Sequence, residues 1–330
     1  MTSIKIIQEW FARCYGSQQQ ETPQPQPGGS VPVPIHRKVL VVIYNPIVQS
    51  EGGSRLAQVM GWSDPQTLAT QFVSDVRQCS HGIANFDIME TITSDTFPVK
   101  EDGFAYTTEA YVNCVRSGSG FHQPDAVDYN HILNDFQMVD RINNGQVDEL
   151  WLFGFPYAGF YESRMAGPGA FPCNSPSLNV PGYNRRFVIM GFNYERGAGE
   201  MLEDLGHRGE AIMQYTFRFL HGSGNLWERF TRYEKANPGQ AEVGTVHYAP
   251  NSPNDYEWGD MTPVLSRCRT WDNYPNLEGD PVMVDSHEWG SGDMRLHHLW
   301  WLGKLPHVTG SSNYITNNWW EYILDPNKVK

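Results

Sequence analysis

The residues with the clearest potential for chemistry lie in one predicted helix, residues 197–217. Glu200, Glu203, His207 and Glu210 stand at positions i, i+3, i+7 and i+10, which places them in a narrow stripe along one side of a helix. Glu203 and His207 are four residues apart, a spacing that lets two side chains of one helix bind the same metal ion. An imidazole together with carboxylates suits zinc, iron or manganese. The stripe therefore predicts a metal site on this helix.

The same stripe also has a structural interpretation. The opposite side of the helix is apolar or small and should pack on a sheet; it consists of Ala198, Met201, Leu202, Leu205, Gly209, Ile212 and Met213. Charged residues opposite such a face are typical of a solvated surface, and the helix dipole favours an acidic residue such as Glu200 in the first turn. The two interpretations differ in whether Glu203 and His207 are sheltered from water.

The segment Glu203-Asp204-Leu205-Gly206-His207 resembles the active-site helix of zincin metallopeptidases, whose pattern is His-Glu-x-x-His. The resemblance implies that Glu203 and His207 are the first and second zinc ligands and that Asp204 takes the place of the catalytic glutamate. Two of these positions depart from the pattern. Glutamate can bind zinc, whereas Asp204 is one methylene shorter than the glutamate that polarises a metal-bound water. The implied protein is a zinc-dependent, peptidase-like hydrolase.

A metal site on this helix needs a further ligand from elsewhere in the chain. Seven of the eleven histidines lie between residues 207 and 307, which favours the C-terminal half as the source. His247, in a segment expected to be strand-like, and His287 are the candidate ligands, with Glu210 as the alternative. Either Asp204 or Glu210 is the candidate catalytic group that polarises the bound water. An ordinary hydrogen-bonded role is the alternative for each histidine.

A loop at residues 154–164 contains the candidate substrate-binding side chains. It leaves the carboxyl end of a predicted strand, where α/β proteins place their ligands. Tyr157, Tyr161, Glu162 and Arg164 could contact a peptide or a glycan there. The alternative is a loop that simply packs on its own aromatic residues.

Buried strands and amphipathic helices alternate in the first two thirds of the chain. The apolar run 38–44 is typical of a strand buried on both faces. Strands are also predicted at 86–92, 149–155 and 186–193, and helices at 129–142, 197–217, 293–303 and 313–324. A long Gly/Pro-rich loop separates the last two strands. The pattern predicts an α/β fold with a mainly parallel or mixed central sheet, packed helices and a loop-rich C-terminal half.

The N-terminus differs in character from the rest of the chain. Residues 1–15 predict a short amphipathic docking helix, and residues 16–36, rich in Pro, Gln and Gly, predict a linker. Residues 37–330 then form a single globular body. The arrangement resembles short cargo-targeting peptides that attach enzymes to protein shells or injection machines, which implies a protein assembly as partner through residues 3–15. Docking onto its own body or onto a membrane surface are the alternatives.

Composition restricts the partners. The formal net charge of −13 argues against nucleic acid and against anionic membranes. No stretch reaches the roughly 18 apolar residues of a transmembrane helix, and no secretory leader is visible, so a cytoplasmic protein is expected. The cysteines form no CxxC pair and should be reduced thiols; in an exported protein, Cys79–Cys114 or Cys173–Cys268 disulfides are the alternative.

Two functions follow from the sequence. The first is a metal-dependent hydrolase with zinc as its cofactor and ligands on the 198–217 helix. The second is a non-catalytic binding or structural protein that recognises a sugar or a protein surface and docks to a larger assembly through its N-terminal helix. The second rests on the 13% aromatic content, which includes 11 tryptophans and could provide a stacking platform.

Overall fold

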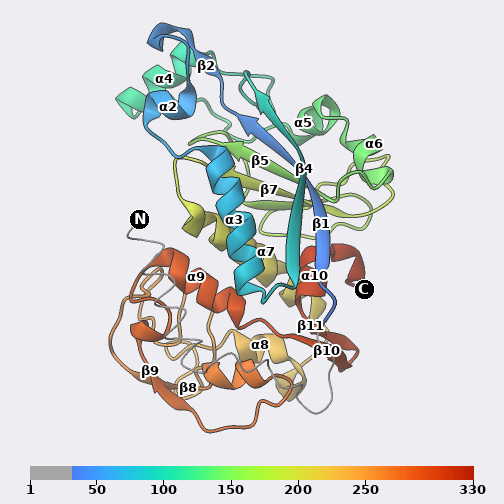
Figure 1. Cartoon of the computed structure of the whole chain (residues 1–330), viewed down its shortest axis with the longest axis vertical. Coiled ribbons are helices and arrows are strands. Elements are labelled where there is room, and N and C mark those ends of the chain that lie inside the picture. Colours follow the sequence, from blue (N-terminus) through green and yellow to red (C-terminus); the bar gives the residue numbers. More distant parts are fainter. Residues whose placement is uncertain (1–31) are drawn as a thin grey trace. The chain divides into compact units, whose positions relative to one another are not determined.

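The structure, a computed structural model, describes residues 32–330. The predicted docking helix at 1–15 and most of the predicted linker at 16–36 lie outside the described residues. The chain divides into two compact units (Figure 1). What we call the sheet unit comprises Ile35–Arg77, Ala84–Ile212 and Leu324–Lys330, and the tryptophan unit comprises Gln78–Ile83 and Met213–Ile323. Both units combine segments distant in sequence, and the single body at 37–330 stays a prediction.

A five-stranded sheet forms the centre of the sheet unit. Its strand order is β4 (Ala84–Ser94), β1 (Ile35–Tyr44), β5 (Glu149–Gly154), β7 (Phe187–Asn193) and β6 (Ser163–Ala166). The first four strands run parallel, and β6 pairs antiparallel with β7. The predicted α/β class with a mainly parallel central sheet and packed helices is therefore confirmed, and the four predicted strands are all present.

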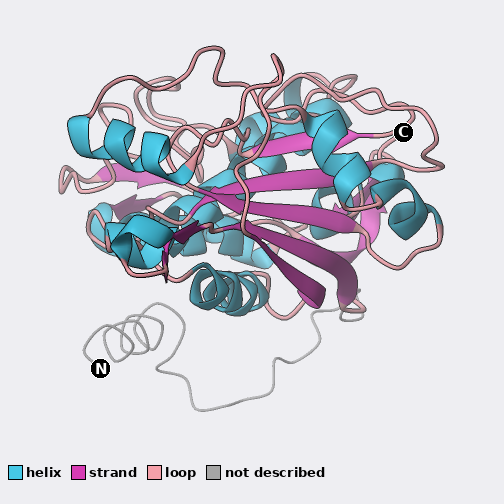
Figure 2. Ribbon diagram, turned by 90° about the horizontal axis from the view of Figure 1, so that it is seen from above, coloured by secondary structure: helices cyan, strands magenta, loops and turns pink. Residues whose placement is uncertain are grey.

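Helices cover both faces of this sheet (Figure 2). On one face, Phe72 of α3 (Pro65–Cys79) packs its ring 5.2 Å from that of Trp151 in β5. On the other face, Tyr44 contacts Phe136, the residue that ends α5 (Tyr129–Asp135), at 6.4 Å between ring centroids. Every residue of β5 is buried, as expected for a central parallel strand with helices on both sides.

The outer strand β4 contains a β-bulge. Val39 of β1 pairs with Ile88, and the next residue, Leu40, pairs with Glu90, so that Met89 has no partner in the register. An extra residue of this kind bends an edge strand and increases its twist.

Two predictions for the sheet unit were wrong. The predicted helix at 129–142 is two helices, α5 and α6 (Met138–Asn143), because Gln137 between them adopts a left-handed φ of 51° that no α-helix continues through. The predicted loop between β5 and β7 contains the edge strand β6. The unit's remaining elements are β2 (Ile47–Val48), η1 (Gln49–Glu51), β3 (Ser54–Arg55), α2 (Leu56–Met60), α4 (Thr108–Ser117), most of α7 (Ala198–Thr216) and η5 (Pro326–Lys328).

The tryptophan unit is held together by buried aromatic rings. Trp227, Trp271, Trp301 and Trp319 all contact the ring of Phe230 at centroid distances of 5.0 to 5.6 Å. Trp301 also donates its indole N–H to the carbonyl of Gly244 at 3.0 Å, which satisfies the polar edge of the ring. These four tryptophans therefore form a core and are not a surface for ligands.

Short elements surround this aromatic core. They are η2 (Gly222–Gly224), α8 (Leu226–Phe230), β8 (Val264–Ser266), η3 (Cys268–Asn273), β9 (Val282–Val284), η4 (Ser286–Glu288), α9 (Met294–Gly303), β10 (His307–Ser312), β11 (Ile315–Asn318) and α10 (Trp320–Leu324). The helix predicted at 293–303 is α9. The helix predicted at 313–324 was wrong in its first half, where β11 pairs antiparallel with β10. The β-branched Ile315 and Thr316 favour this extended conformation.

Within residues 32–330, no helix combines the length and the apolar character needed to span a bilayer. Cys79, Cys114, Cys173 and Cys268 are free thiols, so the alternative of Cys79–Cys114 or Cys173–Cys268 disulfides was wrong.

Candidate metal centre

A buried ion pair fixes helix α7 on the sheet. Arg208 is fully buried, and its Nη1 and Nη2 atoms donate to the two carboxylate oxygens of Glu149 in β5 at 2.7 and 2.6 Å. Two parallel hydrogen bonds hold both side chains in one orientation. They therefore set the rotation of α7 about its axis and with it the direction in which Glu203 and His207 project.

The acidic side of α7 is sheltered from water. Glu203 and Asp204 are only 6% and 7% exposed, although the predicted apolar face is buried as well. The interpretation of the stripe as a solvated surface was therefore wrong at Glu203, which belongs to the stripe. A buried carboxylate is costly unless a cation or a proton accompanies it. Glu200 differs, because its Oε2 accepts a hydrogen bond from the Gly197 N–H at the start of the helix, in keeping with a structural role.

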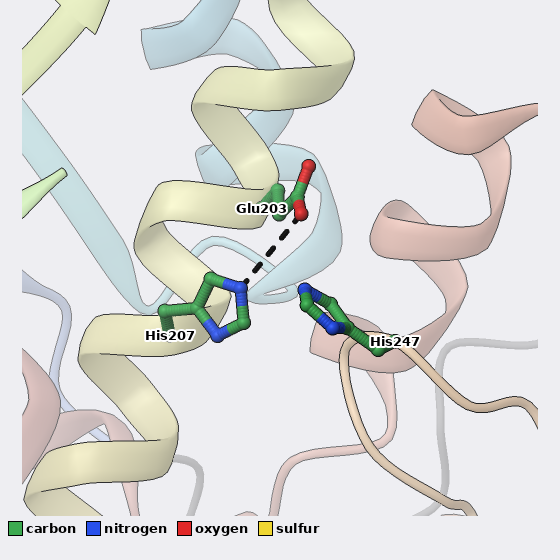
Figure 3. Close-up of side chains that lie close together, drawn as sticks. All are labelled: Glu203, His207 and His247. Carbon is green, nitrogen blue, oxygen red and sulfur yellow. Dashed lines mark ion pairs between the residues drawn. The ribbon is translucent and has the colours of Figure 1, made fainter. Parts of the chain in front are cut away.

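His207 lies between two carboxylates of its own helix. Its Nδ1 is 3.0 Å from Oε2 of Glu210, and its Nε2 is 3.7 Å from Oε1 of Glu203, one turn earlier on α7 (Figure 3). Glu210 can only accept, so it holds the proton on Nδ1 and directs Nε2 toward Glu203. A carboxylate that fixes the far nitrogen of a histidine is the usual outer-shell partner of a metal ligand.

These carboxylates make the position of His207 attractive to a cation. Burial alone disfavours a charged imidazole, but the carboxylates of Glu203 and Glu210 outweigh it and raise the pKa of His207 to about 10. The imidazole is therefore protonated at neutral pH when nothing else neutralises the carboxylates. A metal ion bound to Nε2 has to replace that proton, so metal binding here releases a proton.

The surroundings of Asp204 disfavour its charged form. Burial, followed by the negative charges of Glu162 and Glu203, raises its pKa well above the ordinary value. A carboxyl group whose pKa is raised by burial and by neighbouring charges is a candidate for general acid–base catalysis.

His247 is presented by a tight loop in the tryptophan unit. Gly244 has a φ of +91°, and a Cβ there would lie 2.1 Å from the carbonyl oxygen of Tyr248, so only glycine fits. The loop makes no strand, contrary to expectation. His247 Nδ1 lies 3.0 Å from Oδ1 of Asp255, and its ring packs on Tyr256 at 4.1 Å. Asp255 thus fixes the tautomer of His247 as Glu210 fixes that of His207.

Glu203, His207 and His247 each offer one ligand atom, and these atoms lie within 4.8 Å of one another. Ligands of one tetrahedral zinc ion are about 3.4 Å apart, given bond lengths near 2 Å. Small side-chain rotations would bring three donors at the observed separations to that distance. One carboxylate and two imidazoles form a donor set that zinc uses in catalytic sites.

The other predicted ligand lies elsewhere. His287 is not in this group; its side chain is 65% exposed, and its Nδ1 is 2.8 Å from Oδ1 of Asp285. Glu210 contacts His207 and is not itself one of the three grouped donors.

The predicted substrate loop displays one tyrosine in a strained conformation. Tyr157 is 44% exposed, has a φ of 61° and stacks on Phe121 at 3.7 Å. Lys100, almost fully buried, donates from Nζ to the Tyr157 carbonyl at 2.7 Å and forms an ion pair with Asp125. A left-handed, non-glycine residue persists only where surrounding contacts hold it, and such residues concentrate at functional sites.

Two of the remaining loop residues, Glu162 and Arg164, have partners within the protein. The guanidinium of Arg164 lies 4.8 Å from the ring of Tyr129 and donates to the Pro176 carbonyl at 3.0 Å. Glu162 accepts a hydrogen bond from Asn174, and Tyr161 is 39% exposed. The structure thus leaves Tyr157 and Tyr161 accessible, whereas Arg164 has partners within the protein.

Comparisons with protein-family models, with curated proteins and with solved structures find no match to this chain. The candidate site therefore rests on geometry alone.

Sequence reasoning missed three groups that support the site. Asp255 lies eight residues after His247 in an irregular loop, and no periodicity connects the two. The Glu149–Arg208 pair joins a strand to a helix 59 residues later. The burial of Lys100 has no signal in the sequence, because lysine in a loop is ordinarily exposed.

Proposed function

We propose that Glu203, His207 and His247 bind one divalent transition metal ion, with zinc as the first candidate, and that the bound ion activates water for hydrolysis. The observation that supports this most strongly is the convergence of three donor atoms, with a carboxylate behind each imidazole. Exposed histidines such as His287 also pair with a carboxylate, so the convergence of the three donors, more than the carboxylate partners, distinguishes this group.

The number of ligands favours catalysis over a purely structural metal. Structural zinc sites are closed by four protein ligands, whereas catalytic sites use three and keep one position for water. Zinc lowers the pKa of that water to about 7, which supplies hydroxide at neutral pH. Asp204 is the proposed proton acceptor and donor, and Glu210 positions His207. A peptide bond is the candidate target, because Asp204 occupies the position of the zincin glutamate.

Metal analysis tests the first step. Protein purified without a histidine tag and dialysed after addition of zinc should retain about one equivalent per chain. The variants His207→Gln and His247→Gln should each retain less than about a tenth of an equivalent. His287→Gln is the matched control, since His287 also pairs with an aspartate but lies outside the group. Equal zinc content in all four proteins would rule the site out.

A second experiment separates hydrolysis from metal binding alone. Asp204→Asn keeps the size of the side chain but removes its ability to exchange a proton. With a fluorogenic peptide library as substrate, the zinc-loaded wild type should show turnover that a chelator abolishes. The variant should be slower by about 10² to 10⁴-fold with its zinc content unchanged. A zinc-loaded wild type that cleaves no member of the library would refute the hydrolase and leave the metal site standing.

A second candidate function, recognition of a glycan, is favoured by Tyr157 alone. Its exposed ring, already stacked on Phe121, could extend the stack to the apolar face of a sugar ring. Glycan-array binding that disappears in Tyr157→Ala and persists in Tyr314→Ala would support it, because Tyr314 is a fully exposed tyrosine outside the loop.

A further inference from the structure

A cavity of about 580 Å³ opens at the carboxyl end of the central sheet, where β1 and β4 end. Its walls come from Tyr44, from the segment 95–99 after β4, from residues 105–109 at the start of α4, and from His131 and Asp135 of α5. All of these belong to the sheet unit, and none lies on α7. Open α/β sheets bind their ligands at this end of the strands, and the volume is in the range of small-molecule pockets.

Tyr44, the last residue of β1, brings a buried polar group to this cavity. It is 3% exposed, and its ring is wedged against Phe136 and Phe160 at 6.4 and 5.8 Å. No residue in the described range 32–330 forms a hydrogen bond with its hydroxyl. The hydroxyl oxygen is not among the fully buried polar atoms that lack a partner, so it opens to the cavity, where a ligand can accept its proton. Burial and the negative charge of Asp135 raise the pKa of Tyr44, which keeps the phenol protonated and able to donate.

The charges around the cavity favour a cation. Asp95, Glu109 and Asp135 contribute three carboxylates, and Arg55, which pairs with Asp95, contributes one positive charge, so that two negative charges remain. Asp135 is 3.3 Å from His131, whereas no basic side chain of residues 32–330 pairs with Glu109. This net negative charge would repel an anionic ligand.

The same cavity provides hydroxyl groups and an apolar wall. Thr96, Thr107 and Thr108 line it beside the rings of Phe97 and Tyr106. A ligand that satisfies this lining carries hydroxyl groups for the threonines and carbon atoms for the rings, in addition to its positive charge.

We propose that the cavity bounded by Tyr44, Glu109 and Asp135 binds a small organic cation, a protonated amine on a polyhydroxylated carbon skeleton. The ammonium group donates hydrogen bonds to Glu109 and Asp135, and a hydroxyl of the ligand accepts one from Tyr44. This site is independent of the proposed metal centre.

Two probes that differ in one group test the proposal. Glucamine and sorbitol share a six-carbon polyol chain, and an ammonium group in the first replaces a hydroxyl in the second. In calorimetric titrations of the full chain at pH 7 and low salt, glucamine should bind at least about tenfold more tightly than sorbitol. Equal affinity for the two, or no detectable binding of glucamine, would overturn the proposal.

Variants assign the binding to this cavity. Tyr44→Phe removes only the hydroxyl, and Glu109→Gln removes only the charge of an exposed residue; each should weaken glucamine binding about tenfold. Asp140→Asn is the matched control, an exposed carboxylate on α6 outside the cavity. Binding unchanged in both test variants, or weakened equally in the control, would place glucamine elsewhere and refute the site. Melting curves show whether each variant is folded. If Tyr44→Phe does not fold, Glu109→Gln alone tests the site.

Discussion

His207 in the sheet unit and His307 in the tryptophan unit are both largely shielded from water, yet their charges differ. Burial opposes the charged form of both. At His207 the carboxylates of Glu203 and Glu210 outweigh it and raise the pKa to about 10. At His307, burial and the neighbouring His81 lower the pKa to about 4. The rings of His81 and His307 stack at 4.1 Å, and Nδ1 of His307 donates to the Leu305 carbonyl at 2.9 Å.

The comparison shows that the partners of a buried histidine decide its role. His307 lies against the His81 ring and the Leu305 carbonyl, with no carboxylate hydrogen-bonded to it among residues 32–330, which suits an uncharged imidazole that packs like any other aromatic residue. His207 has acidic partners that require a positive charge, whether it comes from a proton or from a metal. Burial and histidine content alone would not have separated a packing residue from a candidate ligand.

The largest expected effect concerns the Arg208–Glu149 ion pair, which fixes helix α7 and with it His207. Arg208→Met leaves Glu149 buried without its main partner and should lower the free energy of unfolding by about 3–5 kcal/mol. Urea unfolding measures it, and Arg196→Met, whose side chain is 57% exposed, should change stability by less than about 0.5 kcal/mol. A loss below about 1 kcal/mol in Arg208→Met would show that the pair does not anchor α7.

The lowered pKa of His307 leads us to expect a specific dependence of stability on pH. Because the folded-state pKa of His307 is about 4 and the unfolded value is about 6.5, the unfolded chain binds more protons between these limits. His307 therefore leaves the free energy of unfolding undiminished above pH 6.5 and lowers it as the pH falls toward 4. Wild type should lose up to about 3 kcal/mol more than His307→Gln over that interval. Parallel pH profiles for the two proteins would contradict the lowered pKa.

Zinc should stabilise the protein through His207 and independently of His307. At a zinc concentration about 100-fold above Kd, the wild type should gain about 2.7 kcal/mol of stability, seen as a higher Tm. His207→Gln should gain nothing, whereas His307→Gln should respond like the wild type. An equal Tm shift in all three proteins would indicate non-specific binding.

The smallest expected effect concerns Asp255, the carboxylate that pairs with the proposed metal ligand His247. Asp255→Asn can no longer hold the Nδ1 proton of His247 as a charged acceptor, so zinc affinity should fall by about tenfold, or 1.4 kcal/mol. Competition with a chromogenic chelator measures the change. Asp285→Asn, behind His287, serves as the control and should leave affinity unaltered.

The sequence predicted those features that follow from a fixed period. Apolar runs identified β1, β5 and β7 because strands covered on both faces have no polar alternation. The strand β4 was also predicted, although most of its residues are exposed. Helix geometry predicted that Glu203, His207 and Glu210 lie on one side of their helix. The break at Gln137 was missed because the apolar period continues across it, and β6 because four residues in a Gly/Pro-rich loop form no pattern.

The parts of the site built by tertiary structure could not be predicted in the same way. His247 was one candidate among several, since a loop histidine has no periodicity that gives its direction. The partnership of His247 with Asp255 depends on loop conformation alone. The sheltering of Glu203 and Asp204 was not predicted either, because a helical wheel shows which residues share a side but not whether that side is covered.

The two borders of the sheet have a consequence for the behaviour of the protein at high concentration. An uncovered edge strand recruits strands from other molecules, and this is a common start of aggregation. At one border β6 is only four residues long, and its last residue, Ala166, bridges to Leu178 of the following loop. At the other border, the bulge at Met89 lies between the charged side chains of Asp87 and Glu90. Neither border offers a regular template, which should disfavour strand-by-strand association between copies of the chain.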